Sequence, residues 1–192
     1  MTLILATRNP HKVREVARLL AADGIAVEPL PEHVELPPET GATFEANALP
    51  KARAAARALG RAAIADDSGI EAAALGGAPG VRSARYAGED ASDEENLTKL
   101  RREAPAGSRL RYVCALAYVD AEGEEHVFFG ESSGRLAADP RGTGGFGYDP
   151  AFLPDDGPDG LTMAELPDEE KDAISHRGRA LRAFAEWYGQ AR

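Results

Sequence analysis

Apolar residues follow two periodicities along the chain, and these predict alternating strands and helices. Short apolar runs predict strands over 2–6, 25–30, 62–65, 110–119 and 125–132. Apolar positions at helical spacing predict helices from Pro10 up to Gly24, over 43–59 and 92–103, and in the C-terminal region around 174–188. This alternation, with a turn at 120–123 that forms a hairpin, indicates an α/β fold with a mixed β-sheet flanked by helices.

Local signals mark where the helices begin. Asn9 before Pro10 is typical of a helix N-terminus, because asparagine caps the first turn and proline lacks an N–H that would have no partner there. Ser92 and Glu95 have the spacing of a capping box. Pro50 lies inside the helix predicted over 43–59 and should either kink it or delay its start, and we expect a kink.

Composition and charge narrow the class of protein. A chain of 192 residues, 43% hydrophobic and 28% charged, is typical of a single globular domain, here 1–192. The net charge of −10 argues against a nucleic-acid polymer or an anionic membrane as partner. No apolar run approaches the roughly 20 residues of a membrane span, and 3–6 is too short for a signal-peptide core. With one cysteine, an intramolecular disulfide is excluded. We therefore expect a cytoplasmic protein.

Two segments combine a predicted strand end with groups that bind phosphate or metal. After the first strand, the segment 7–12 places Lys12 near a helix N-terminus, where free N–H groups attract anions. An ordinary capped helix with a solvated lysine fits the same residues. After the third strand, Asp66 and Asp67 are adjacent carboxylates, whose mutual repulsion favours a bound cation such as Mg²⁺. A polar turn over 66–69 is the alternative interpretation.

Two later segments offer a surface for a planar ligand and a second basic helix end. Glycines over 142–147 alternate with Phe146 and Tyr148, which suggests backbone close to a flat ligand and an aromatic ring for stacking; a mobile loop is the alternative. If Ser175 caps the last helix, His176 and Arg177 lie in its first turn, where they can bind a phosphate or a carbonyl. Solvated basic residues on a surface helix are the alternative there.

Two other patterns carry no function in our interpretation. Residues 130–134 match the G-x-S-x-G pattern of hydrolases, but no helix of useful length follows before Pro140. Cys114 lies in the most apolar predicted strand, so we expect a packed thiol.

Together these segments describe a site for a nucleoside polyphosphate with Mg²⁺, and the chain resembles the inosine/xanthosine triphosphate pyrophosphatases. The resemblance spans the chain in five stretches: ATRNPHKVREV (6–16), ETGATFEANALPKA (39–52), AIADDSGIEAAALGGAPGVRSARYAGEDASDEEN (63–96), GTGGFGYDP (142–150) and AELPDEEKDAISHRGRAL (164–181). It implies two lobes with a central substrate cleft. It also implies hydrolysis of non-standard purine nucleoside triphosphates (ITP, dITP, XTP) to the monophosphate and pyrophosphate, and a homodimer.

The resemblance also implies roles for individual residues. Asp67 is the expected general base and, with Glu39, the expected Mg²⁺ ligand. The expected triphosphate-binding residues are Thr7, Arg8, Asn9, Pro10, His11 and Lys12. Ser68 is expected to contact the substrate; Phe146, Gly147, Tyr148 and Asp149 to form the base and sugar pocket; and Lys171, His176 and Arg177 to complete the site, the last two at the 6-oxo edge of the purine.

One departure from the family pattern concerns the metal site. The family commonly has Thr-Phe-x-Glu-Asn-Ala, whereas Ala46 stands here in place of the glutamate that would close a capping box with Thr43. Glu45 could therefore partly substitute as a ligand for Glu39. Two other functions stay open at this stage: a nucleotide sensor that does not hydrolyse its ligand, and a pyrophosphatase for modified pyrimidine triphosphates.

Overall fold

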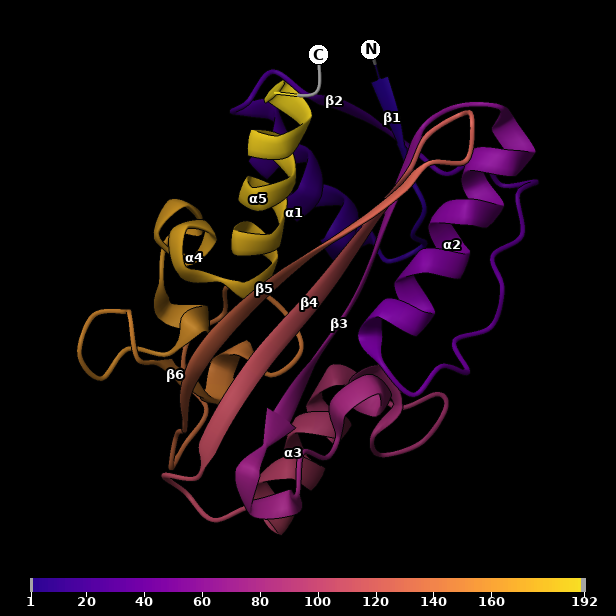
Figure 1. Ribbon diagram of the computed structural model, residues 1–192. Helices are drawn as coiled ribbons and strands as arrows, with labels where there is room; N and C mark the ends of the chain where they lie inside the picture. The colour runs from indigo at the N-terminus through magenta and orange to yellow at the C-terminus, as the bar shows by residue number, and fades with distance from the viewer. Residues whose placement is uncertain (1, 191–192) are drawn as a thin grey trace. The chain divides into compact units, whose positions relative to one another are not determined.

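The computed structural model describes residues 2–190 of the chain (Figure 1). These residues contain six strands and five α-helices. In chain order they are β1 (Thr2–Leu5), α1 (Pro10–Ala21), β2 (Ala26–Pro29), α2 (Phe44–Leu59), β3 (Ala63–Ala72), α3 (Asp93–Glu103), β4 (Arg109–Val119), β5 (Glu125–Leu136), β6 (Phe152–Pro154), α4 (Asp168–Ile174) and α5 (His176–Gln190). Short 3₁₀ turns cover Ala73–Leu75, Gly80–Arg85, Asp149–Ala151 and Met163–Glu165.

The strands form one sheet in the order β2-β1-β3-β4-β5-β6. β1 is parallel to both of its neighbours, with Leu3 opposite Val27 and Ile4 opposite Ala63, whereas β6 is antiparallel to β5. The predicted mixed sheet flanked by helices is therefore confirmed.

The chain divides into two compact units, each built from separate stretches of sequence. Unit 1 contains the described residues up to Asp67, Cys114–Gly130 and those from Arg177 onward; unit 2 contains Ser68–Val113 and Glu131–His176. These units are the counterpart of the two expected lobes. The single domain over 1–192 and the substrate cleft stay predictions.

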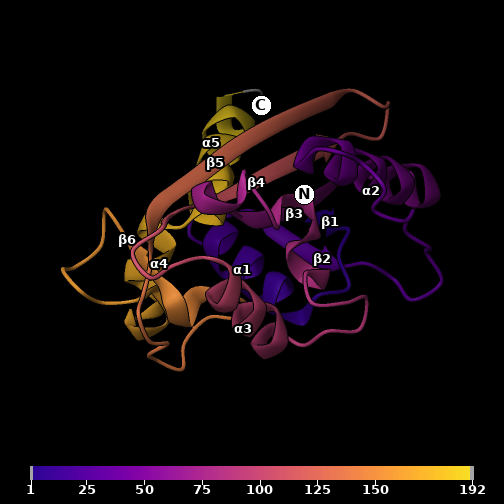
Figure 2. The same ribbon diagram turned by 90° about the horizontal axis from the view of Figure 1, so that it is seen from below.

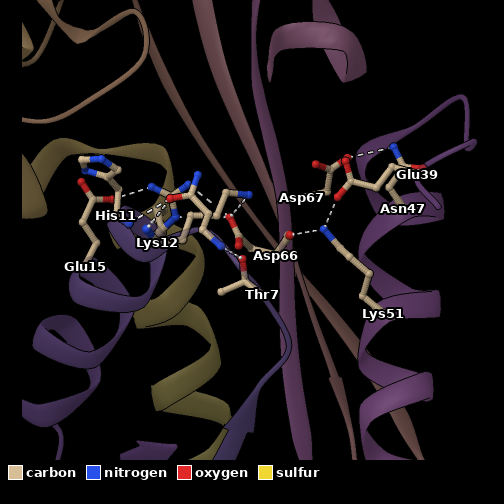
Figure 3. A network of polar contacts seen from close by, with 11 residues as sticks. Thr7, His11, Lys12, Glu15, Glu39, Asn47, Lys51, Asp66 and Asp67 are labelled. Atoms are coloured by element: carbon tan, nitrogen blue, oxygen red, sulfur yellow. Dashed lines mark hydrogen bonds and ion pairs between the residues drawn. The ribbon is translucent and has the colours of Figure 1, made fainter. Parts of the chain in front are cut away.

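Unit 1 has its own apolar core, in which helices pack against strands. Val16 and Leu20 of α1 and Leu181 and Phe184 of α5 belong to one buried cluster with residues of β1, β3 and β4. α2 lies on the opposite side of β3 (Figure 3). The turn between β4 and β5 lies beside α2 in both views (Figures 1 and 2), where Arg53 forms a two-pronged ion pair with Glu125.

Unit 2 has a second core. It is formed around α3 and the segments of β3, β4 and β5 that belong to this unit. Leu97 and Leu100 of α3 pack there with Ile70, Tyr112 and Phe152. Both hydrogen bonds of the capping box predicted for α3 are present. Among the described residues, no helix has the length and apolar character needed to cross a membrane.

The elements differ from the prediction in two places. β3 continues through 66–69 to Ala72, so the segment predicted as a turn or strand end is strand. β6 lies in a part of the chain for which the sequence predicted no strand. Pro50 does not delay the start of α2, which begins at Phe44 after the cap Thr43; the kink stays a prediction.

Candidate functional site

The turn between β1 and α1 is organised by Asn9, as its sequence predicts. The side chain of Asn9 accepts hydrogen bonds from the N–H groups of His11 (2.9 Å) and Lys12 (3.3 Å), and Pro10 follows as the first helical residue. The hydroxyl of Thr7 in turn accepts from the N–H of Asn9 at 3.2 Å. The segment is therefore a preformed helix start.

Arg8 points from this turn into the loop that follows β2. Its guanidinium donates to the carbonyl oxygens of Leu30 (2.8 Å), Pro31 (2.8 Å), Glu32 (3.2 Å) and Val34 (2.8 Å). A planar fork with several N–H groups suits this arrangement better than a lysine would. Arg8 thus fixes the loop, and its expected contact with triphosphate stays a prediction.

Asp66 and Asp67 are adjacent in β3 and their side chains point to opposite faces of the sheet (Figure 3). Successive side chains of a strand alternate in this way. Asp66 lies on the side of α1 and α5, and Asp67 on the side of α2 (Figure 3). The expected repulsion between two neighbouring carboxylates therefore does not describe this pair, and each has its own surroundings.

Asp66 is completely buried and neutralised by cations from two helices. Lys12 reaches its carboxylate at 3.0 Å and Arg177 at 3.2 Å, and Arg177 also pairs with Glu15 of α1 at 2.5 Å. Burial alone would raise the pKa of Asp66, but the positive charges of Lys12, Arg177 and Lys51 lower it well below its usual value. Asp66 is thus ionised and organises the basic groups around it.

Asp67 belongs to a second polar group, formed with α2 and the loop before it. The amide of Asn47 donates to Asp67 at 2.9 Å. Lys51 binds Glu39 at 2.5 Å and the backbone carbonyl of Asp66 at 2.7 Å. Burial, helped by the negative charge of Glu39, raises the pKa of Asp67 above its usual value despite the opposing effect of Lys51. A buried carboxylate with a raised pKa is suited to accept a proton.

The donor set around Asp67 fits a Mg²⁺ ion that shares its ligands with a substrate. Glu39 lies close enough to Asp67 for its negative charge to raise the pKa of Asp67, and the two carboxylates lie side by side in Figure 3. Within residues 2–190, no group of three or more His, Cys, Asp or Glu side chains could hold a metal alone. Mg²⁺ is commonly bound by one or two carboxylates together with phosphate oxygens, so the two residues fit it.

In unit 2, the loop 142–149 is held by Asp149. This buried carboxylate accepts hydrogen bonds from the N–H of Phe146 (3.0 Å), the hydroxyl of Tyr112 (3.0 Å) and the amine of Lys171 (2.8 Å). At Gly145, whose φ is +67°, an added Cβ would lie 2.1 Å from Asp149. This glycine is therefore required by the protein's own packing, whereas the sequence suggested the approach of a ligand.

The aromatic residues of this loop have different surroundings. Phe146 is half-buried, and the amine of Lys171 lies 5.4 Å from the centre of its ring. Tyr148 is buried and donates its hydroxyl to the carbonyl of Ser83 at 2.7 Å. The N–H of Gly147 donates to Asp93, at the start of α3, at 2.8 Å. Phe146 is therefore the more accessible of the two expected pocket rings.

The remaining expected site residues are Ser68, His176 and Arg177, which flank the points in the sequence where the chain passes from one unit to the other. α5 begins at His176 after Ser175, which agrees with the predicted start. His176 is buried in unit 2 and stacks on Tyr112, whereas Arg177 belongs to unit 1 and binds Asp66 and Glu15. Ser68 is a half-buried residue of β3. Roles for all three expected residues stay predictions.

Sequence reasoning missed several residues that build these groups. Asn47 and Lys51 lie four apart in α2, so they share a helix face, and the scarcity of lysine in the chain was a usable signal for Lys51. Glu45, the suggested substitute ligand, is exposed. For Glu15 and Tyr112 the sequence carries no signal, because their partners are distant along the chain.

Comparisons with known proteins agree over nearly the whole chain. The Ham1 family profile matches residues 3–187. A dITP/XTP pyrophosphatase of Mycolicibacterium paratuberculosis is 49% identical, covering 94% of this chain and 92% of its own length, and one of Symbiobacterium thermophilum is 51% identical, covering 93% and 90%. A solved HAM1 protein from Coxiella burnetii superposes with a TM-score of 0.84 at 38% identity, covering 99% of both chains. The crystal structure of a nucleoside-triphosphatase / dITP/XTP pyrophosphatase from Mycobacterium abscessus gives a TM-score of 0.71 at 46% identity, covering 96% and 98%.

Proposed function

The chain belongs to the Ham1 family, and from this and the geometry around Asp67 we propose that it hydrolyses non-standard purine nucleoside triphosphates to the monophosphate and pyrophosphate. The resemblance stated from the sequence is thereby confirmed. The observation that carries the proposal is a buried carboxylate with a raised pKa, Asp67, beside Glu39, Asn47 and Lys51.

Asp67 is the general base in the proposed reaction. Its carboxylate takes a proton from water, the water oxygen bonds to the α-phosphorus, and the bond from that phosphorus to the bridging oxygen breaks, releasing pyrophosphate. The hydrogen bond from Asn47 holds the carboxylate in one orientation. Lys51, whose pKa is raised by the surrounding carboxylates against the opposing effect of burial, stays protonated beside it.

Asp67 and Glu39 are the residues that would hold Mg²⁺. When bound there, the ion supplies positive charge to the phosphate oxygens. Lys51 binds Glu39 next to Asp67, so the two donors are held close together.

The preformed start of α1 is the proposed triphosphate site. Lys12 supplies positive charge and is itself held by Asp66, so its amine has a fixed position before substrate binds. Residues of this site are Thr7, Arg8, Asn9, Pro10, His11 and Lys12.

The proposed base-binding residues lie in β3, the loop 142–149, α4 and the start of α5. Phe146 stacks on the purine, with Gly147, Tyr148 and Asp149 contributing to the sugar and base pocket, and Ser68 contacts the substrate. Lys171, His176 and Arg177 complete the site, and the last two bind the 6-oxo edge. Adenine presents a donor at this position and would leave a buried donor unpaired, which costs about 1–3 kcal/mol.

Two further properties belong to the proposal. The relatives are small-molecule enzymes by name, so we propose a nucleotide substrate and no nucleic-acid or membrane partner. We also propose a cytoplasmic homodimer, on the strength of the resemblance. Light scattering tests the dimer, which should have about twice the mass of the 20.3 kDa chain.

The test measures pyrophosphate and orthophosphate release from ITP, XTP, GTP, ATP, UTP and dTTP, with Mg²⁺ and with EDTA. We expect pyrophosphate from ITP and XTP alone, and no turnover in EDTA. Orthophosphate as the product would overturn the mechanism, and turnover of UTP or dTTP would favour the pyrimidine alternative. Tight ITP binding without turnover would favour the sensor.

Variants assign the chemistry to the residues. Asp67→Asn should abolish turnover while ITP binding stays measurable by calorimetry, because the amide cannot take a proton from water. Glu39→Gln should raise the Mg²⁺ concentration needed for half-maximal rate. Asp159→Asn, at an exposed loop position, is the matched control and should behave as the unchanged protein.

A further inference from the structure

Tyr112 of β4 contacts the proposed base-binding residues but has no role so far. It is 6% exposed, and its ring lies parallel to the imidazole of His176, with ring centres 4.4 Å apart and an angle of 2° between the planes. Phe152 packs against the same ring at 4.8 Å and 50°. The tyrosine ring is thus fixed by the core of unit 2, and the imidazole plane is aligned with it.

The hydroxyl of Tyr112 makes a second connection. It donates to one carboxylate oxygen of Asp149 at 3.0 Å, while the other oxygen accepts from Lys171 (2.8 Å) and from the N–H of Phe146 (3.0 Å). One side chain therefore touches His176 directly, and reaches Lys171 and Phe146 through a single carboxylate. Burial raises the pKa of Tyr112 well above its usual value, so the hydroxyl remains a donor across the working pH range.

The contacts of Tyr112 matter because of where Tyr112, Phe146 and His176 lie in the fold. Phe146 lies in a loop and His176 at the first position of a helix, whereas Tyr112 lies in a central strand of the sheet. Hydrogen bonds to a purine edge depend on the plane of the imidazole, and stacking depends on the position of the phenyl ring. Binding residues are held accurately when supporting side chains lock their rotamers from a rigid element.

We propose that Tyr112 is a positioning residue for purine recognition: its ring sets the plane of His176, and its hydroxyl holds Asp149 and, through it, Lys171 and the Phe146 loop. This inference rests on the proposed function. It adds a determinant of base selectivity that does not itself touch the base.

The experiment separates the hydroxyl from the ring. Tyr112→Phe removes the hydrogen bond and keeps the stacked ring, whereas Tyr112→Leu removes both. Tyr118→Phe and Tyr118→Leu are matched controls, because Tyr118 is a buried tyrosine of the same strand that packs in unit 1. For each variant kcat and KM are measured with ITP, and kcat/KM is measured with ATP at high enzyme concentration, because adenine is the base that differs from hypoxanthine at position 6. The ring protons of His176 are followed by NMR, since a stacked tyrosine shifts them upfield.

We expect Tyr112→Phe to raise KM for ITP about fivefold with kcat nearly unchanged. The reason is that the carboxylate of Asp149 loses the hydrogen bond from the tyrosine hydroxyl. Tyr112→Leu should lower the preference for ITP over ATP about tenfold, which corresponds to about 1.4 kcal/mol of discrimination. The upfield shift of His176 should persist in the phenylalanine variant and disappear in the leucine variant. The Tyr118 variants should leave both the preference and the shift unchanged.

Several results would overturn the inference. One is an unchanged KM in Tyr112→Phe, which decides the matter alone if the leucine variant does not fold. Another is a uniform loss for both substrates that the Tyr118 variants share, because that would reflect packing only. If the unchanged protein releases no pyrophosphate from ITP, the proposed function fails instead, and the NMR shift still shows whether Tyr112 orients His176.

Discussion

At the scale of single residues, Asp66 and Asp67 show how one chemical group serves two purposes. Asp66 is surrounded by Lys12, Arg177 and Lys51, and its pKa is lowered despite burial. Asp67, one residue later and on the other face, has a raised pKa because burial and Glu39 outweigh the cations. The alternation of the strand separates a structural carboxylate from one that can carry chemistry.

Asp66→Asn should destabilise the fold strongly. The substitution leaves the buried Arg177 and the half-buried Lys12 with one negative charge fewer, and breaking a buried ion pair costs about 3–5 kcal/mol. Urea unfolding measures the loss. Asp139→Asn, at an exposed ion pair with Arg101, is the control and should change stability by less than about 1 kcal/mol. A loss that small in Asp66→Asn would contradict the structural role of the cluster.

Asp67→Asn should instead stabilise the fold at neutral pH, measured in EDTA. The folded state raises the pKa of Asp67, so its ionised form is less favourable there than in the unfolded chain. The wild type therefore gains stability as the pH falls from above the raised pKa of Asp67 toward the ordinary carboxyl value, because the folded state takes up the proton first. The advantage of the asparagine variant should therefore be largest at pH 7 and vanish in acid. Equal stability of the two proteins at pH 7 would contradict the raised pKa.

At the scale of elements, the loop between β2 and α2 depends on a residue that the sequence assigned to substrate. Four carbonyl oxygens of that loop converge on Arg8. The loop leads to Glu39, so its conformation bears on where that carboxylate lies.

Arg8→Lys should loosen this loop. Lysine keeps the charge but lacks the planar fork, and the loss of hydrogen bonds should cost about 1–2 kcal/mol of stability. Hydrogen exchange of the amides over 30–34 should become faster. Arg14→Lys, on the exposed face of α1, is the matched control and should leave that exchange unchanged. If exchange is as slow in Arg8→Lys as in the unchanged protein, the conformation of the loop does not depend on the Arg8 hydrogen bonds.

Most elements could be predicted from the sequence, and the errors have physical reasons. Caps and periodicity placed α1, α2 and α3 within one or two residues, because these signals are local. The extension of β3 through Asp66 and Asp67 could not be predicted, since aspartates normally oppose strands. Here their charges are offset by partners distant in sequence, such as Arg177, 111 residues from Asp66.

The candidate site follows the same rule. Residues in local motifs, such as Lys12, Asp67 and Lys171, could be named from the sequence. Tyr112 could not, because it lies in an apolar strand and its contacts to Asp149 and His176 exist only after folding.

At the scale of the whole molecule, both units are interleaved along the chain. The described chain crosses between them four times, after Asp67, Val113, Gly130 and His176. β3, β4 and β5 each contribute residues to both units. Neither unit is a continuous segment that could be expressed alone.

We therefore expect thermal unfolding in one cooperative transition. If unit 2 unfolded first, its parts of β3, β4 and β5 would lose their order while the adjoining residues of the same strands had to keep theirs. Differential scanning calorimetry tests this, because the calorimetric and van't Hoff enthalpies agree for a two-state protein. Asp66→Asn provides the internal check: it perturbs unit 1, so in a cooperative molecule the whole transition moves to lower temperature. A variant trace with two transitions, one unmoved, would show that the units unfold independently.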